Sequence, residues 1–178
     1  MKPHLLAGTF LLLIILSGCA TRQEYIHDRG TIVMPFDLSS TTHVFQVIEN
    51  GGLQQVTVKN SSDLQNIILI QEHLAEISEE FAKGNFSDPK MLHGDDMPGV
   101  SILEEKYEAL SVSYTPLDNG AQILYSSSDP EVVQAIHDWF DAQLMDHGAD
   151  ATGEFNSSVC DEVPEGHPAD LWRLHHGC

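Results

Sequence analysis

Four short runs of β-favouring residues predict strands along the middle of the chain. The clearest run alternates the apolar residues Leu110, Val112 and Tyr114 with polar neighbours, as expected of a half-buried strand. The first two runs flank Asn50-Gly51-Gly52 and the last two flank Asp118-Asn119-Gly120, so each pair predicts a β-hairpin. The predicted strands are 43–48, 53–58, 110–115 and 121–125.

Apolar residues at spacings of three and four predict one helix after each hairpin. The first helix, of about twenty residues, follows the N-cap candidates Ser61-Ser62-Asp63 and ends at Lys83-Gly84-Asn85. The second begins at Asp129-Pro130 and ends at Gly148. The apolar stripes are Ile67, Ile70, Leu74, Ile77 and Phe81 in the first helix, and Val133, Ile136, Phe140 and Leu144 in the second.

The order of these elements predicts an α+β domain. Its ββα-ββα plan favours one four-stranded antiparallel sheet with both helices on one face, which leaves the other face for solvent, a partner or a ligand. Gly52 and Gln54 align with Gly120 and Gln122 at a constant offset, which indicates a pseudo-repeat of the two halves. The connection 85–99 is long for a small domain, and we expect it to be irregular.

The first residues have the pattern of an export signal. The almost wholly apolar run of twelve residues, 5–16, would reach only ~18 Å as a helix, too short to cross the ~30 Å core of a membrane. They end in Leu16-Ser17-Gly18-Cys19, which matches the bacterial lipobox and predicts lipidation of Cys19. Ala20 favours sorting to the periplasmic face of the outer membrane. We expect a signal peptide over 1–18, a lipidated tether over 19–41, the domain over 42–149 and a flexible tail over 150–178 containing His and Cys.

Charge limits the partners of this chain. With 27 acidic and 8 basic residues its net charge is −19, so it lacks the basic footprint that nucleic-acid binding needs. The lipid on Cys19 is then the predicted link to the membrane. Cys160 and Cys178 are expected to form a disulfide in an oxidising compartment. Alternatively, they are thiol ligands beside the tail residues His167, His175 and His176, which form a second, weaker metal candidate.

Several short motifs between His43 and Gly148 carry a family resemblance. They are His43-Val-Phe-Gln46, Gly51-Gly-Leu-Gln-Gln-Val56, Glu72-His-Leu74, Gly84-Asn-Phe-Ser-Asp-Pro89, His93-Gly94, Met97-Pro-Gly99, His137-Asp-Trp-Phe140 and Asp146-His-Gly148. Together they resemble a family of short bacterial proteins, some of which are labelled aspartate carbamoyltransferase. That activity is rejected for this chain, because it needs a Ser-Thr-Arg-Thr phosphate-binding segment that the sequence lacks. The resemblance therefore implies the domain and no chemistry.

Histidine is the unusual residue, with 10 in the chain. Helical and strand spacing place several of them on or beside apolar faces, so they are expected to converge near the loop that holds His93 and Met97. Imidazole with thioether suits copper and imidazole with carboxylate suits zinc; copper is favoured here. The predicted metal ligands are His93, Met97, His137, His73, His43 and His147. The alternative is that His73 and His137 are hydrogen-bonded boundary residues and that Met97-Pro98-Gly99 is only a structured turn.

The leading functional prediction is therefore an envelope lipoprotein that binds copper or zinc for buffering or delivery. The alternative is a protein-interaction module that docks an envelope partner through the free sheet face. An enzyme is not expected: His137 and Asp141 could form a base and its orienting carboxylate, but no activated nucleophile accompanies them. The sequence also has no Gly-rich phosphate loop, so no nucleotide or organic cofactor is predicted.

Overall fold

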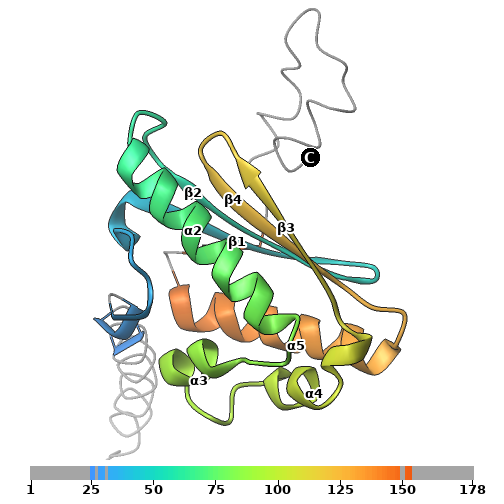
Figure 1. Cartoon of the computed structure of the whole chain (residues 1–178). Helices are drawn as coiled ribbons and strands as arrows, with labels where there is room; N and C mark the ends of the chain where they lie inside the picture. The colour runs from blue at the N-terminus through green and yellow to red at the C-terminus, as the bar shows by residue number, and fades with distance from the viewer. Residues whose placement is uncertain (1–24, 27, 31, 149–150, 154–178) are drawn as a thin grey trace, which may run out of the picture.

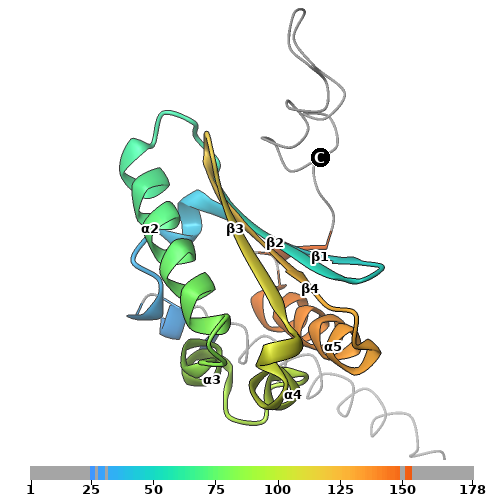
Figure 2. The same cartoon turned by 45° about the vertical axis from the view of Figure 1, so that its right-hand side comes forward.

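The fold is a five-stranded sheet with two long helices on one face (Figures 1 and 2). It was analysed in a computed structural model that describes residues 25–26, 28–30, 32–148 and 151–153. The strands are β1 (Thr41–Ile48), β2 (Gly51–Val58), β3 (Ser111–Leu117), β4 (Gly120–Ser126) and β5 (Ala151–Thr152). The helices are η1 (Leu38–Ser40), α2 (Leu64–Phe81), α3 (Ser87–His93), α4 (Val100–Glu105), η2 (Tyr107–Ala109) and α5 (Pro130–His147).

The sheet confirms both predicted hairpins but differs from the predicted sheet in size and type. Its strand order is β3-β4-β2-β1-β5, with β1–β2, β2–β4 and β3–β4 antiparallel. β5 adds a fifth strand that pairs with β1 in parallel, so the sheet is mixed. The prediction of four antiparallel strands was wrong because β5 has only two residues and follows the end of α5, where no alternation marks it. The pseudo-repeat stays a prediction.

Both long helices begin and end close to the predicted residues. The carboxylate of Asp63 accepts from the Asn66 backbone N–H at the start of α2, and that of Asp129 accepts from Glu131 at the start of α5. The predicted stripe of α2 is buried in full. In α5 the buried side is wider than the predicted stripe and includes residues outside it. The buried residues of α5 are Val132, Ala135, Ile136, Trp139, Phe140, Gln143 and Asp146.

The connection 85–99 is helical only in part: α3 lies within it, and 94–99 contain no helix or strand, as expected of an irregular connection. The helix α4 follows this connection and packs against α5. Gly99 precedes α4 with φ 78°, and a Cβ at this position would lie 2.0 Å from the Ala135 carbonyl oxygen. Glycine is therefore needed there for two reasons, its backbone conformation and the close approach of the two helices.

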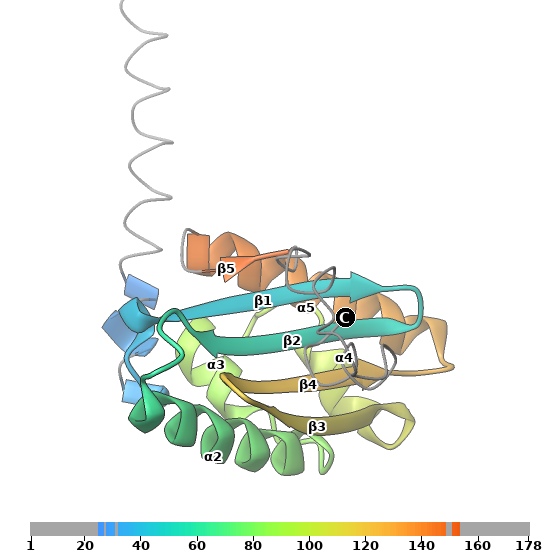
Figure 3. The same ribbon diagram turned by 90° about the horizontal axis from the view of Figure 1, so that it is seen from above.

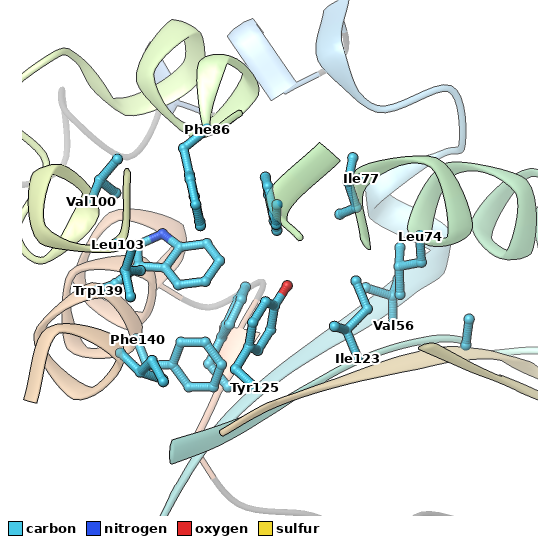
Figure 4. Packing of buried hydrophobic residues seen from close by; sticks show 14 of the residues in the cluster. Val56, Leu74, Ile77, Phe86, Val100, Leu103, Ile123, Tyr125, Trp139 and Phe140 are labelled. Carbon is cyan, nitrogen blue, oxygen red and sulfur yellow. The ribbon is translucent and has the colours of Figure 1, made fainter. Parts of the chain in front are cut away.

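An aromatic cluster fills the space between the sheet and the helices (Figure 4). The Trp139 ring meets Phe81, Phe86 and Tyr125 edge-on, with ring centroids 5.3–5.8 Å apart. The Tyr125 hydroxyl donates to Gln54 Oε1 at 2.7 Å, which satisfies the one polar group of this ring in the core. The cluster fixes the middle of α5 on the sheet and so positions both ends of that helix.

Packing continues on the N-terminal side of residue 42. Phe36 and Leu38 belong to the hydrophobic core, so part of the predicted tether lies against the domain. No helix in the described part of the chain is long and apolar enough to cross a membrane. The predicted signal peptide, Cys19, Cys160, Cys178 and the tail histidines lie outside the described residues.

Candidate functional site: a histidine-lined cavity

Four of the predicted metal ligands line one cavity between the sheet and the helices. His43 comes from β1, His73 from α2, His93 from the last residue of α3 and His147 from the last residue of α5. The cavity has a volume of about 60 Å³, which is room for an ion with a few waters. Four elements that are distant in the sequence therefore bring imidazoles to one place.

Three of these imidazoles form a continuous row. The ring centroid of His147 lies 5.7 Å from that of His43 and 5.3 Å from that of His93. His73 stands apart, because the Phe36 ring lies between it and His43 at 5.8 Å and 5.9 Å. The row His43–His147–His93 is thus the core of the candidate site, with His73 at its margin.

A carboxylate holds one end of this row. His93 Nδ1 lies 2.8 Å from Asp146 Oδ2, and the two side chains are only 1% and 8% exposed. This bond fixes the plane of the His93 ring and directs its other nitrogen, Nε2, away from Asp146. Histidines that bind metals commonly have such a carboxylate on the second ring nitrogen.

Burial keeps two of the cavity histidines neutral. Burial, together with smaller contributions from the nearby His147, His73 and Lys59, lowers the pKa of His43 to about 3. Burial also lowers the pKa of His73, against the opposing effect of Asp88 and Glu76. Only a neutral imidazole can ligate a metal, so neither side chain has to lose a proton at pH 7 before it binds one.

Two polar groups on α5 reach the cavity without a hydrogen-bond partner. Trp139 Nε1 and Gln143 Oε1 are both buried, and neither has a partner among the described residues. Both residues line the cavity. Buried donors and acceptors are nearly always satisfied, so this pair indicates a bound water or ligand.

His137 and Met97 are not in the cavity. His137 Nε2 donates to the carbonyls of Ile48 and Gly51, each at 3.0 Å, and so joins α5 to the turn between β1 and β2. Met97 is 5% exposed and packs in the hydrophobic core. The sequence placed Met97 near His93 because it follows four residues later in the chain. It placed His137 there because helical spacing gives the buried side of a helix but not the partner that covers it.

The cavity also has a wall that sequence reasoning missed. Val33, Met34 and Phe36 line it from the segment before β1. Met34 lines the cavity together with the four histidines, where the sequence analysis had expected Met97. No periodic pattern marks 32–36, and a tether was predicted there, so the sequence offered no signal for this contact.

Comparison with known proteins finds no counterpart: no family model, curated protein or solved structure matches this chain. The suspected family resemblance therefore stays a prediction. Among the described residues, no group of three or more His, Cys, Asp or Glu side chains is arranged to hold a metal ion as it stands. Metal binding would need the imidazole rings of the row to turn.

Proposed function

We propose that this chain is a non-catalytic envelope lipoprotein that takes up a transition metal ion in the histidine cavity, for buffering or delivery. The observation that carries the proposal is the row His43–His147–His93, with Asp146 bonded to its far end. The predicted lipid on Cys19 would attach the chain to the membrane. The net charge of −19 favours the approach of cations.

The spacing of the row is close to that of metal ligands. Metal–nitrogen bonds of about 2.0–2.1 Å in a tetrahedral site put the ring centres of two imidazoles about 5 Å apart. The two neighbouring pairs of the row have centroid separations of 5.3 Å and 5.7 Å, and the rings would have to turn about the side-chain bonds to bring their nitrogens onto one ion. His73 or Met34 would supply the fourth ligand.

The remaining lining fits a hydrated ion. A water on the metal could donate to Gln143 Oε1 and another could accept from Trp139 Nε1, which would satisfy both buried groups. The thioether of Met34 favours copper over zinc, since soft sulfur ligands select Cu(I). No organic cofactor enters this proposal.

Calorimetric titration of metal-free residues 20–178 with Zn(II), Cu(II) and Cu(I) tests the proposal. We expect one tight site per chain, and His93→Ala should weaken it at least 100-fold. His137→Ala is the matched control, because it removes a histidine outside the cavity; its affinity should equal that of the unmodified chain. A peptide of residues 154–178 is titrated separately, since it carries the tail histidines and cysteines. Binding no tighter than this peptide, or unchanged in His93→Ala, would overturn the proposal.

A further inference from the structure

The described residues between 25 and 33 are helical and have two different sides. Ile26 is only 1% exposed, and Gly30, four residues later, is also buried. Tyr25 is 53% exposed and Ile32 is 78% exposed. These two residues are seven apart, or about two helical turns, so they lie on the same side of the segment. The segment therefore packs on the domain through one side and presents two large apolar side chains on the other.

Arg29 lies between these two side chains along the same segment. Its guanidinium donates to the Tyr25 hydroxyl, and its central carbon lies 5.2 Å from the centre of the Tyr25 ring. Arg29 also lines a hollow together with Lys90 and Met91 of α3, and Met91 is 51% exposed. Exposed apolar side chains from two segments thus lie beside two cationic groups. We call the surface formed by Tyr25, Arg29, Ile32, Lys90 and Met91 the N-terminal face.

This face mixes apolar, aromatic and cationic side chains in a chain that is strongly acidic. Of the five Lys and Arg among the described residues, Arg29 and Lys90 are on it. Carboxylates are present as well: Asp95 lines the hollow, Glu104 accepts from Lys90, and Asp28 is exposed. A tyrosine ring, exposed aliphatic side chains and long basic side chains with apolar stems are the groups that suit the interface between a membrane and water.

The length of the chain before this face indicates which partner it meets. The predicted lipid is on Cys19, and Tyr25 follows six residues later. Six residues span at most about 21 Å even when fully extended, so an anchored chain keeps Tyr25 within about that distance of the lipid surface. The end of β1, which carries the exposed Val47, lies at the opposite end of the molecule (Figures 1 and 3). The anchor therefore brings the N-terminal face, and not the end of β1, to the bilayer.

We propose that the N-terminal face lies on the phospholipid bilayer, with Tyr25, Ile32 and Met91 at the boundary between headgroups and acyl chains. Arg29 and Lys90 would then lie near lipid phosphates, while the acidic remainder of the surface points away from anionic lipids, which repel it. The inference rests on the proposed lipoprotein, and it adds the orientation that the domain takes on its membrane.

The segment that contacts the bilayer is also next to the histidine cavity. Val33 and Met34 line that cavity and directly follow Ile32 in the chain. Docking through the N-terminal face would therefore place the candidate metal site on the membrane side of the domain.

Methyl NMR on a lipid nanodisc tests this orientation. Residues 19–178 carrying Cys160→Ser and Cys178→Ser are coupled through the Cys19 thiol to a maleimide lipid. The bilayer consists of phosphatidylethanolamine and phosphatidylglycerol, and a gadolinium chelate on some headgroups broadens the resonances of methyl groups close to its surface. We expect the methyls of Ile32 and Met91 to broaden several-fold more than those of Val47, although Val47 is 46% exposed.

A pair of variants separates docking from mere closeness to the anchor. Ile32→Asp places a carboxylate in the face, so the broadening of the Met91 methyl should fall several-fold, toward that of Val47. Val47→Asp is the matched control, since it adds the same charge at the opposite end of the molecule, and it should leave Met91 as broad as before. Unchanged resonances of the buried Ile70 report that each variant is folded.

Broadening of Met91 that is unchanged in Ile32→Asp would overturn the proposal, because the tether alone would then account for it. Equal or stronger broadening of Val47 in the unmodified chain would also overturn it, because the domain would then tumble freely or dock through another face. The coupled lipid supplies the anchor, so these results depend neither on lipidation in the cell nor on metal binding. Mass spectrometry of Cys19 in the chain purified from cells tests the lipidation separately.

Discussion

α5 carries two histidines ten residues apart, and they have different surroundings. His137 donates to two backbone carbonyls at the turn between β1 and β2. His147, about 15 Å farther along the helix axis, faces the imidazoles of His43 and His93. His137 therefore links α5 to the turn between two strands, whereas His147 lies in a cavity among other imidazoles.

The difference comes from what the rest of the fold presents to each end of the helix. The turn presents backbone carbonyls, which accept a hydrogen bond from the N–H of His137. A ligand would have to break this bond to use the same ring nitrogen. The end of α3 and the strand β1 present the imidazoles of His93 and His43 to His147 instead. Histidine content alone does not identify a binding site; the chemistry of the neighbours does.

Among the variants that test the difference between His147 and His137, Asp146→Asn is expected to have the largest effect, a loss of metal affinity at the cavity. Asparagine keeps the shape of the side chain but removes the charge that orients the His93 ring, so metal affinity should fall about 10- to 100-fold. The matched control is Asp138→Asn on the same helix, where the carboxylate accepts from Gln134 on the surface. Calorimetric titration compares the two. Equal affinity losses in both variants would show a general effect of charge instead.

The stability of the metal-free chain should depend on pH through His43. Its pKa is about 3 in the folded chain and 6.5 as the ordinary value, so below pH 6.5 the unfolded chain takes up a proton that the folded chain does not. Stability is therefore lost as the pH falls from 6.5 toward 3, by about 2 kcal/mol between pH 7 and pH 5. Urea unfolding in EDTA at several pH values measures this loss. His43→Gln should show a shallower loss over the same range; an unchanged slope would contradict the assignment to His43.

Much of the fold could be predicted because the hydrophobic pattern within each strand and helix identifies it without knowledge of its neighbours. The alternation of Val112 and Tyr114 with serines marks a strand whichever sheet it joins, and the five-residue stripe of α2 needs only one covering surface. In α5 the prediction failed at Val133 and Leu144, which are only half-buried. The reason is that α4 gives this helix a second covered side, which brings Val132 and Trp139 into the core.

The candidate site could be predicted only in part, for a related reason. His43 and His73 lie beside apolar stripes, so their spacing already placed them near the core. Which histidines meet depends on long-range packing, and that packing brought in Met34 and moved His137 and Met97 to other surroundings. The segment 32–36 has no periodic pattern, so its position against the cavity could not be predicted from the sequence.

The smallest expected effect is that of replacing His137, the histidine of α5 outside the cavity. His137→Ala removes the donor to the carbonyls of Ile48 and Gly51, and should lower the free energy of unfolding by about 1 kcal/mol. The loss is modest because the turn is close to the surface and water can reach the carbonyls. His137→Gln, whose amide can also donate, should recover part of it. Urea unfolding of both variants measures this difference. A change in metal affinity in His137→Ala would contradict the contrast between His137 and His147. It would show that a histidine bonded to the turn contributes to metal binding in a cavity that it does not line.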